Sequence, residues 1–286
     1  MAARLHRALP SLAAALSLTA AASTVGQELP DLVTPEVLRV CADPADLPLS
    51  NRKGEGFENR IAEIIASALG VPTRYYWLQK GPGFVHNTLG MKLCDVIIGY
   101  ATGTELVLHT SPYYRSTYVL VARRGALPGV TSLGDPALKG RRIGMVAGTP
   151  PGDHLAEHGL IEQVRPYSPY ILGSDRNATP ASAMIDDVAS GALDVAVLWG
   201  PAAGALARRA GGLEIVPLLH ETDRPALSFR IALAVRPNEH AWKRTLDRIL
   251  RQKRAEIQKV LQDYDVPLVD DENHLIGAAS LSGGRP

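Results

Sequence analysis

Four stretches of this sequence place polar, glycine or aromatic residues at the end of a predicted strand or just before one, where a binding crevice would lie. In open α/β sheets the loops at the carboxyl ends of the strands line the ligand crevice. Aromatic rings in such loops can stack on a ligand, and an arginine can pair with a carboxylate. We expect these residues to line a cleft for a ligand or a partner: Asp43, Ser50, Asn51, Phe57, Tyr100, Thr102, Tyr113, Tyr114, Arg115, Gly148, Thr149 and Trp199.

The first two stretches also have purely structural explanations. The segment 43–57 is rich in proline and glycine and is also typical of a surface loop. Within it, Phe57 is either an apolar lid over a ligand or a core residue at the start of a helix. Tyr113 and Tyr114 can form a packed pair beside a solvated Arg115. The sequence leaves both alternatives open.

The other two stretches end in the turn Gly148-Thr149 and in Trp199. The free N–H groups of a helix after this turn would attract a carboxylate, but Pro150 and Pro151 remove two of those donors. Proline is also ordinary at the start of a helix. We expect Trp199 to form a stacking wall at the crevice edge, because a core position would require a partner for its indole N–H.

One motif resembles the ligand set of a zinc peptidase. Residues 154–158 have the form H-x-x-E-H, which on a helix places His154 and His158 on one face. A catalytic zinc site needs a third protein ligand, and no local motif supplies one. We therefore expect a solvated helix face and no metal. The sequence also lacks a nucleophile elbow, a P-loop, an EF-hand loop and a dinucleotide fingerprint, so we expect no enzyme and no cofactor.

The beginning of the chain predicts export. Arg4 and Arg7 precede the apolar run 12–22, and the small residues 20–22 form an A-x-A-like cleavage pattern. The run is shorter than the roughly 20 residues that span a bilayer, although an N-terminal anchor is the alternative. We expect a cleaved signal peptide at 1–26, a periplasmic location and no membrane span in the mature chain. The formal net charge of +1 excludes a large basic field for nucleic acid.

The fold class is predicted to be α/β, because short apolar runs alternate with segments of helical periodicity, as in βαβ units with parallel sheets. The predicted strands are 37–42, 73–78, 95–101, 117–123, 142–147, 194–199, 214–219 and 231–235. The predicted helices are 57–69, 83–93, 182–193, 202–210 and a long charged helix at 239–263.

The length of 286 residues favours two packed units. A stretch rich in glycine, proline and charge interrupts the middle of the chain, and a second break occurs at 224–225. We therefore expect one lobe from 31–123 and 226–270 and a second lobe from 124–225, with two strand crossings as the hinge. The Gly- and Ser-rich tail 271–286 is expected to be flexible.

The chain has only two cysteines, Cys41 and Cys94. An oxidising compartment favours a disulfide between them. However, Cys41 lies late in one predicted strand and Cys94 at the start of another. If these strands are parallel neighbours, the two Cα atoms lie beyond the ~7 Å limit for a disulfide. The sequence leaves the pairing open.

Five blocks of the sequence resemble one known family. They are 38–44 (LRVCADP), 50–59 (SNRKGEGFEN), 94–99 (CDVIIG), 112–118 (PYYRSTY) and 199–201 (WGP). The chain resembles the periplasmic solute-binding proteins of family 3, which bind polar amino acids, and within them the MxaJ/XoxJ-type proteins associated with quinoprotein methanol dehydrogenases. This resemblance implies the type II fold, with two α/β lobes, parallel sheets, a two-strand hinge and a cleft.

The chain departs from the amino-acid binders at the carboxylate clamp. Those proteins carry an arginine in a Thr-x-x-Arg pattern shortly before Pro-Tyr-Tyr, and it grips the carboxylate of the ligand as a bidentate pair. The corresponding stretch 102–109 (TGTELVLH) has no arginine, and Glu105 has the opposite charge. A free amino acid would leave its charges poorly paired in a closed cleft. We therefore expect that the fold is kept and the amino-acid chemistry lost.

The resemblance implies a periplasmic accessory protein of a pyrroloquinoline-quinone methanol or alcohol dehydrogenase. Such a protein would act by binding a protein or a cofactor, with the dehydrogenase or its cytochrome as the partner. The alternative is an ABC transporter substrate-binding protein for a small solute other than an amino acid. The first should bind or activate a quinoprotein dehydrogenase, and the second should bind a small molecule tightly and gain stability from it.

Overall fold

The computed structural model describes residues 33, 35–103, 106–170, 179–221 and 225–276, all of which belong to one compact unit, 31–286. The predicted signal peptide at 1–26 lies outside the described residues. Among the helices of the described part, none is long and apolar enough to cross a membrane.

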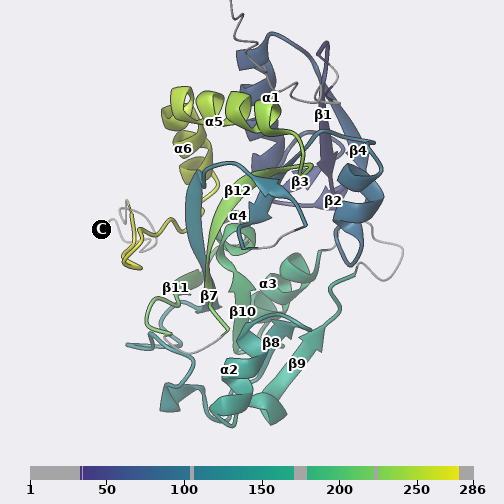
Figure 1. Cartoon of the computed structure of the whole chain (residues 1–286). Coiled ribbons are helices and arrows are strands. Elements are labelled where there is room, and N and C mark those ends of the chain that lie inside the picture. Colours follow the sequence, from purple (N-terminus) through teal and green to yellow (C-terminus); the bar gives the residue numbers. More distant parts are fainter. Residues whose placement is uncertain (1–32, 34, 104–105, 171–178, 222–224, 277–286) are drawn as a thin grey trace, which may run out of the picture. The chain divides into compact units, whose positions relative to one another are not determined.

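The chain forms a mixed α/β structure, which confirms the predicted fold class (Figure 1). Its strands are β1 (Leu38–Ala42), β2 (Ala45–Asp46), β3 (Ser50–Asn51), β4 (Thr73–Trp77), β5 (Val96–Ala101), β6 (Leu108–His109), β7 (Tyr114–Arg123), β8 (Ile143–Val146), β9 (Val164–Tyr167), β10 (Val195–Trp199), β11 (Leu213–Pro217) and β12 (Ser228–Val235). Its helices are α1 (Phe57–Leu69), α2 (Pro151–Glu157), α3 (Pro180–Ser190), α4 (Gly200–Ala210), α5 (His240–Gln252) and α6 (Arg254–Asp263), with short helical turns η1 (His86–Gly90), η2 (Pro136–Leu138) and η3 (Ile161–Gln163).

The main sheet contains two parallel groups of strands joined by two long antiparallel strands. The strand order is β4-β1-β5-β12-β7-β10-β8-β9, with β6 paired to β12 and β11 paired to β7. β1 is parallel to β4 and β5, and β8 is parallel to β9 and β10. β7 and β12 run antiparallel to each other, and in addition β7 is antiparallel to β10 and β12 is antiparallel to β5 (Figure 1). The sheet as a whole is therefore mixed, although the predicted parallel pairing holds within each group.

All eight predicted strands are present, with ends that differ by at most a few residues. Most contain a short apolar run, and β1 and β10 are largely buried. The sequence did not predict β9, because Arg165 and Pro166 interrupt its apolar character. A proline cannot donate to a strand ladder and is tolerated at an edge, and β9 is the last strand in the sheet order.

Helix α1 begins and ends where the sequence predicts. Phe57, Ile61 and Ile65 recur every four residues and are fully buried, so they form the face that packs on the sheet. The helix ends at Gly70, whose left-handed φ of 73° lets its N–H reach the carbonyls of the last turn. This helix carries Glu58 into the site described below.

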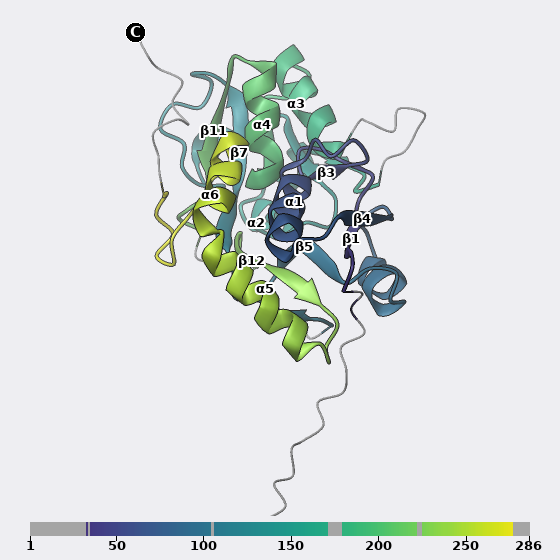
Figure 2. The same ribbon diagram turned by 90° about the horizontal axis from the view of Figure 1, so that it is seen from above.

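Two other predicted helices are different in the structure. The segment 83–93 forms turns around η1, because Gly83 and Lys92 have positive φ angles of 80° and 60° that interrupt helical geometry. The predicted helix 239–263 is divided at Lys253 into α5 and α6, which follow one another in Figure 2.

The buried side chains form cores on both faces of the sheet. α1, α5 and α6 cover one face of β1, β5 and β12. Alternate residues of the same strands point to the opposite face, where Phe84 and Leu89 form a smaller core with Ile97. Two further cores involve β7, β8 and β10 with the segments around α2, α3 and α4. The lobe boundaries stay a prediction.

The stretch that was predicted to be a flexible tail, 271–286, is described as far as Ile276. Asp270 N–H donates to the carbonyl of His274 (2.9 Å), and Ile276 N–H donates to that of Leu268 (2.8 Å). Residues 271–276 therefore form a hydrogen-bonded turn, and residues 277–286 lie outside the described part of the chain.

The two cysteines form a disulfide, with Cα atoms 5.4 Å apart. β1 and β5 are parallel neighbours, as the sequence suggested, and Cys41 lies opposite Ile97 in their register. Cys94 does not belong to β5, which starts at Val96, but to the turn before it. Because the chain turns there, Cys94 approaches Cys41 instead of lying farther back along the strand pair.

We predict that removing this disulfide destabilises the fold. The double variant Cys41→Ala/Cys94→Ala should lose about 3–4 kcal/mol of unfolding free energy, since the bond restricts a long loop of the unfolded chain. Urea unfolding with and without a reductant measures the difference. The reductant should weaken the wild type and leave the variant unchanged; equal midpoints for both proteins would contradict the prediction.

Candidate functional site

The loop between β1 and α1 brings three of the predicted crevice residues together, and their polar groups are bound within the loop. Asp43 follows β1 and is 4% exposed. Its carboxylate accepts the N–H groups of Ala45 (2.9 Å) and Lys80 (2.6 Å), and its carbonyl accepts the hydroxyl of Ser50 (2.9 Å). The side chain of Asn51 accepts two further N–H groups of the loop. These side chains therefore hold the loop in shape.

A cluster of charged side chains that the sequence did not predict lies beside this loop. Lys80 Nζ lies 3.1 Å from Glu58 Oε2 and 3.6 Å from Asp46 Oδ2. Burial lowers the pKa of Lys80, but the charges of Glu58 and Asp46 outweigh burial and hold that pKa above its ordinary value. Gly99 makes room for the cluster, because a Cβ there would collide with Glu58 Oε1. The ammonium group is therefore already paired.

The carboxyl group of Asp46 has a strongly raised pKa. Burial raises its pKa from 3.8 to about 7, opposed by the charge of Lys80 and supported by the charges of Glu58 and Asp43. Because the carboxylates of Glu58 and Asp43 lie near Asp46, holding a proton on Asp46 relieves the repulsion between like charges. The cluster has no spare positive charge.

A pocket of about 500 Å³ lies next to the cluster. Lys80 and Arg236 line it, while Phe84 and Leu89 supply apolar walls. Tyr100 also lines the pocket and is the single member of the predicted crevice set that does so. The pocket is thus built mainly by the segment around η1, where the sequence led us to expect an ordinary helix.

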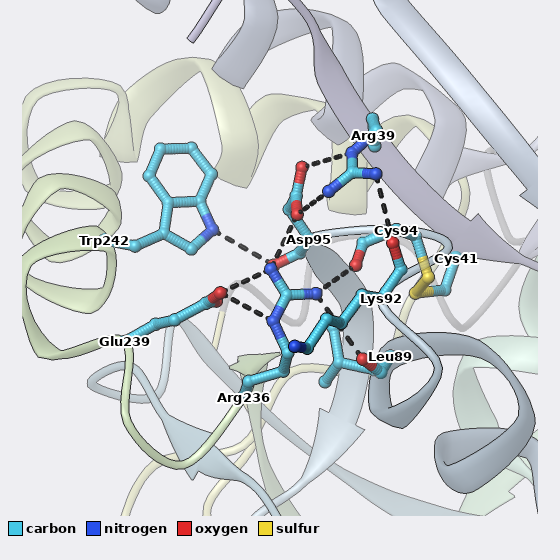
Figure 3. A network of polar contacts seen from close by, with 9 residues as sticks. All are labelled: Arg39, Cys41, Leu89, Lys92, Cys94, Asp95, Arg236, Glu239 and Trp242. Carbon is cyan, nitrogen blue, oxygen red and sulfur yellow. Dashed lines mark hydrogen bonds and ion pairs between the residues drawn. A yellow bond between two sulfur atoms is a disulfide. The ribbon is translucent and has the colours of Figure 1, made fainter. Parts of the chain in front are cut away.

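A second charged network holds the far side of this pocket in place (Figure 3). The carboxylate of Asp95 is 1% exposed and accepts Arg39 Nη2 at 2.6 Å and Arg236 Nη2 at 2.7 Å. The hydrogen bond to Asp95 raises the pKa of Arg39. Trp242 Nε1 donates to the backbone carbonyl of Asp95 at 3.0 Å. The carboxylate of Asp95 thereby connects β1 and the end of β12 to the start of β5, and its backbone carbonyl connects α5.

Arg236 uses its remaining donors on the chain itself. Its Nε donates to Glu239 Oε1 at 2.6 Å, and its Nη1 donates to the carbonyls of Cys94 (2.5 Å) and Leu89 (3.4 Å) (Figure 3). These bonds tie the disulfide turn and η1 to β12. Like Lys80, this cation is compensated before any ligand arrives.

The predicted tyrosine pair is packed in the core. The rings of Tyr113 and Tyr114 meet edge to face with centroids 5.0 Å apart, and the hydroxyl of Tyr113 donates to the carbonyl of Ile98 (3.0 Å). Burial raises the pKa of both phenols well above 10. Phe57 is also a core residue, 5.9 Å from the ring of Tyr264, and not a lid.

Arg115 and Thr102 are likewise occupied by the chain. Arg115 Nη1 donates to the carbonyl of Asp270 at 2.5 Å, so this guanidinium anchors the segment after α6. Thr102 N–H donates to the carbonyl of Arg230 at 2.9 Å. Residues 104–105, which include the position of opposite charge in the predicted clamp, lie outside the described residues.

Two of the last three predicted residues, Trp199 and Thr149, contact the same tyrosine, Tyr118. The ring of Trp199 lies 5.4 Å from that of Tyr118 and 5.8 Å from that of Phe229. Burial raises the pKa of Tyr118 to about 12, and Thr149 bonds its hydroxyl. Gly148 has a φ of 75°, the left-handed turn that glycine favours. Trp199 is half-buried and packs against two cores, so it is not an isolated stacking wall.

The H-x-x-E-H motif forms no metal site among the described residues, which contain no group of three or more suitable ligands. His154 is fully buried, and its Nε2 donates to the carbonyl of Pro225 at 2.7 Å. Its Nδ1 lies 4.0 Å from Glu221 Oε2. The expectation of a solvated helix face is therefore wrong for His154, because α2 turns this residue toward the core beside Leu155.

Sequence reasoning missed the charged residues of the two networks beside the pocket, of which Lys80 and Arg236 line it: Arg39, Asp46, Glu58, Lys80, Asp95, Arg236 and Glu239. Some had a weak signal: Asp95 and Arg236 flank continuous apolar strands, where a charge requires a partner once buried. The partner could not be identified, because Asp95 and Arg236 are 141 positions apart in the chain.

Comparison with known proteins places the chain among relatives of similar length. No family model matches it. Protein MoxJ of Methylorubrum extorquens is 33% identical over 250 residues, 82% of this chain and 83% of that protein. Protein MoxJ of Paracoccus denitrificans is 27% identical over 263 residues, 87% of this chain and 95% of that protein.

Solved structures show the same relationship. The periplasmic binding protein XoxJ from Methylobacterium extorquens is 48% identical, with a TM-score of 0.71 over 82% of this chain and all of that chain. MxaJ from Methylophaga aminisulfidivorans is 26% identical, with a TM-score of 0.72 over 81% of this chain and all of that one. An ancestral cationic amino acid solute-binding protein shares the fold at 18% identity and a TM-score of 0.62, covering 80% of this chain and 96% of its own.

We predict that Asp95→Asn is strongly destabilising. It leaves two guanidinium groups facing a neutral amide, and breaking a buried ion pair on one side costs about 3–5 kcal/mol. The matched control is Asp271→Asn, which removes the carboxylate of the exposed Arg230–Asp271 pair and should change the unfolding free energy by less than about 1 kcal/mol. Urea unfolding compares them; similar losses in both variants would refute the role given to Asp95.

We predict a pH dependence that belongs to Asp46. Between pH 3.8 and about 7 its folded form holds a proton that the unfolded chain releases. The unfolding free energy therefore falls as the pH rises through this window. In Asp46→Asn this contribution is absent, so its pH profile should be flatter over the same range. Parallel profiles of the two proteins in urea unfolding would show that Asp46 titrates normally.

Proposed function

Because the chain belongs to the family of the MoxJ, MxaJ and XoxJ proteins, we propose that it is a periplasmic accessory protein of a pyrroloquinoline-quinone methanol dehydrogenase. It acts by binding, not by catalysis. Its partner is the dehydrogenase or the cytochrome that accepts its electrons, and it serves the loading, maturation or activation of the enzyme.

One observation carries this proposal: the cations that could bind a small carboxylate are already bonded within the chain. Lys80 is paired with Glu58, Arg236 with Asp95 and Glu239, and Arg115 is bonded to a backbone carbonyl. A ligand carboxylate that paired with Lys80 or Arg236 would leave a buried carboxylate of the chain unpaired, which is unfavourable. Together with the missing clamp arginine, this argues for a binding-protein fold used for something other than amino-acid capture.

Family membership supports the periplasmic location, since a relative that is 48% identical is a periplasmic binding protein. The disulfide between Cys41 and Cys94 suits an oxidising compartment. A periplasmic protein that lacks the arginine of the carboxylate clamp is suited to a periplasmic function other than amino-acid uptake. Quinoprotein dehydrogenases are the partners that the resemblance of its sequence blocks suggested.

A second candidate function is the capture of a small solute for transport. The pocket of about 500 Å³ favours it, because this volume suits a small organic molecule. In that case the solute should raise the unfolding free energy through mass action, by about 2.7 kcal/mol when its concentration is a hundred times its Kd.

We predict that the immobilised protein retains a purified quinoprotein methanol dehydrogenase holoenzyme or its cytochrome partner, and that the dehydrogenase changes in activity when the two are mixed. The control column carries an amino-acid-binding protein of the same fold. Calorimetry with the common amino acids should show no binding. Failure to retain either partner, together with a purified protein that carries a stoichiometric amino acid, would overturn the proposal.

A further inference from the structure

We propose that the pocket beside η1 is a binding site for a neutral, largely apolar small molecule. This site differs from the crevice that the sequence suggested, because Tyr100 is the one residue of that set that lines it. The proposal goes beyond the accessory function and does not depend on the identity of the protein partner. It is based on the walls of the pocket and on the charge state of its two cations.

Most of the pocket wall is apolar or consists of backbone. Phe84, Leu89 and Ile97 belong to the small core on this face of the sheet, yet they also line the pocket. Glycines of the segment 81–90 add backbone and no side chains. Leu106 also lines the pocket and is 69% exposed, so an apolar ligand there would cover its side chain.

On the side of α1, the pocket has no free positive charge. Lys80 Nζ lies 3.1 Å from Glu58 and 3.6 Å from Asp46, and the backbone N–H of Lys80 bonds the carboxylate of Asp43. Two carboxyl groups, those of Glu58 and Asp46, thus flank one ammonium group. An anionic ligand here would be repelled, because the local charge is neutral or negative in either state of Asp46.

On the side of β12, the charges also cancel. Arg236 and Arg39 share the carboxylate of Asp95, and Arg236 also pairs with Glu239. These four groups carry two positive and two negative charges. Both cations of the pocket wall are therefore neutralised by the chain, which disfavours a carboxylate or phosphate and leaves the apolar walls to provide the affinity.

Polar groups at the pocket wall allow a ligand with one or two neutral polar atoms. His86 is exposed and lines the pocket, and its ring nitrogens can donate to a carbonyl or accept from a hydroxyl. The volume of about 500 Å³ admits one or two aromatic rings or a short aliphatic chain. The ligand class is therefore an uncharged aromatic or aliphatic compound bearing at most a carbonyl or hydroxyl group.

Two probes with one ring skeleton test the charge argument on the purified full chain. N-phenylnaphthylamine is neutral and fluoresces in apolar surroundings, and anilinonaphthalene sulfonate is the same skeleton with one negative charge. The neutral probe should bind saturably at one site, and the sulfonate should bind at least about tenfold more weakly. Equal affinity for the two probes, or no saturable binding of the neutral one, would overturn the proposal.

A charge variant makes the test independent of pocket shape. Glu58→Gln removes the closest counter-charge of Lys80, so the sulfonate probe should gain about tenfold in affinity while the neutral probe is unchanged. Glu63→Gln is the matched control, because Glu63 lies on the exposed side of the same helix and bonds Thr73. No change in selectivity in Glu58→Gln would show that the paired lysine does not set the ligand class.

A filling variant locates the probe. Val85→Trp places a large ring in the pocket wall and should abolish binding of the neutral probe, with circular dichroism and urea unfolding to verify the fold. Leu106→Trp fills the pocket from an exposed position and keeps the test valid if the first variant does not fold. Binding of wild-type strength in a folded variant of either kind would place the probe elsewhere and refute the site.

Discussion

The arrangement of the pocket depends on one buried carboxylate that is shared by two guanidinium groups. Asp95 is almost inaccessible, and it holds Arg39 from β1 and Arg236 from the end of β12. A buried ion pair does little for stability compared with an apolar packing of equal shape, but an incomplete one is costly. The network therefore acts as a constraint: it tolerates only the arrangement in which both arginines meet the same carboxylate. Because Arg236 also bonds the carbonyls of Leu89 and Cys94, that constraint fixes the segment that forms the pocket wall.

The same principle explains how a solute-binding fold can lose its original ligand chemistry. A charged ligand is held in a closed site by a counter-charge that the protein leaves unpaired in its absence. In this chain Lys80 and Arg236 face the pocket, but each already has carboxylate partners. Their charges serve the folded structure and are not available for binding. The scaffold and a cavity are present, and the two cations at this cavity are already paired within the chain.

The disulfide and the two charged networks act on a single stretch of chain. Residues 80–95 begin at Lys80, which is tied to the loop after β1, and end at Cys94 and Asp95, which are tied to β1 and β12. Between these anchors the glycines and the positive φ of Lys92 prevent a regular helix. Its ends are held by charged and covalent contacts, while Phe84 and Leu89 in its middle pack by apolar contacts and also line the pocket.

The sequence by itself determined the fold class, the eight main strands and the exact extent of α1, because apolar periodicity and glycine caps are local signals. It also showed that the clamp arginine is missing, which is a matter of residue identity. It could not determine the disulfide, whose formation depends on a turn before β5, nor the burial of Phe57, Tyr114 and His154. Only the tertiary structure revealed that Lys80 and Arg236 share a pocket and are already neutralised. Burial and ion pairing are properties of residues that meet in space, and those that form this site lie far apart along the chain.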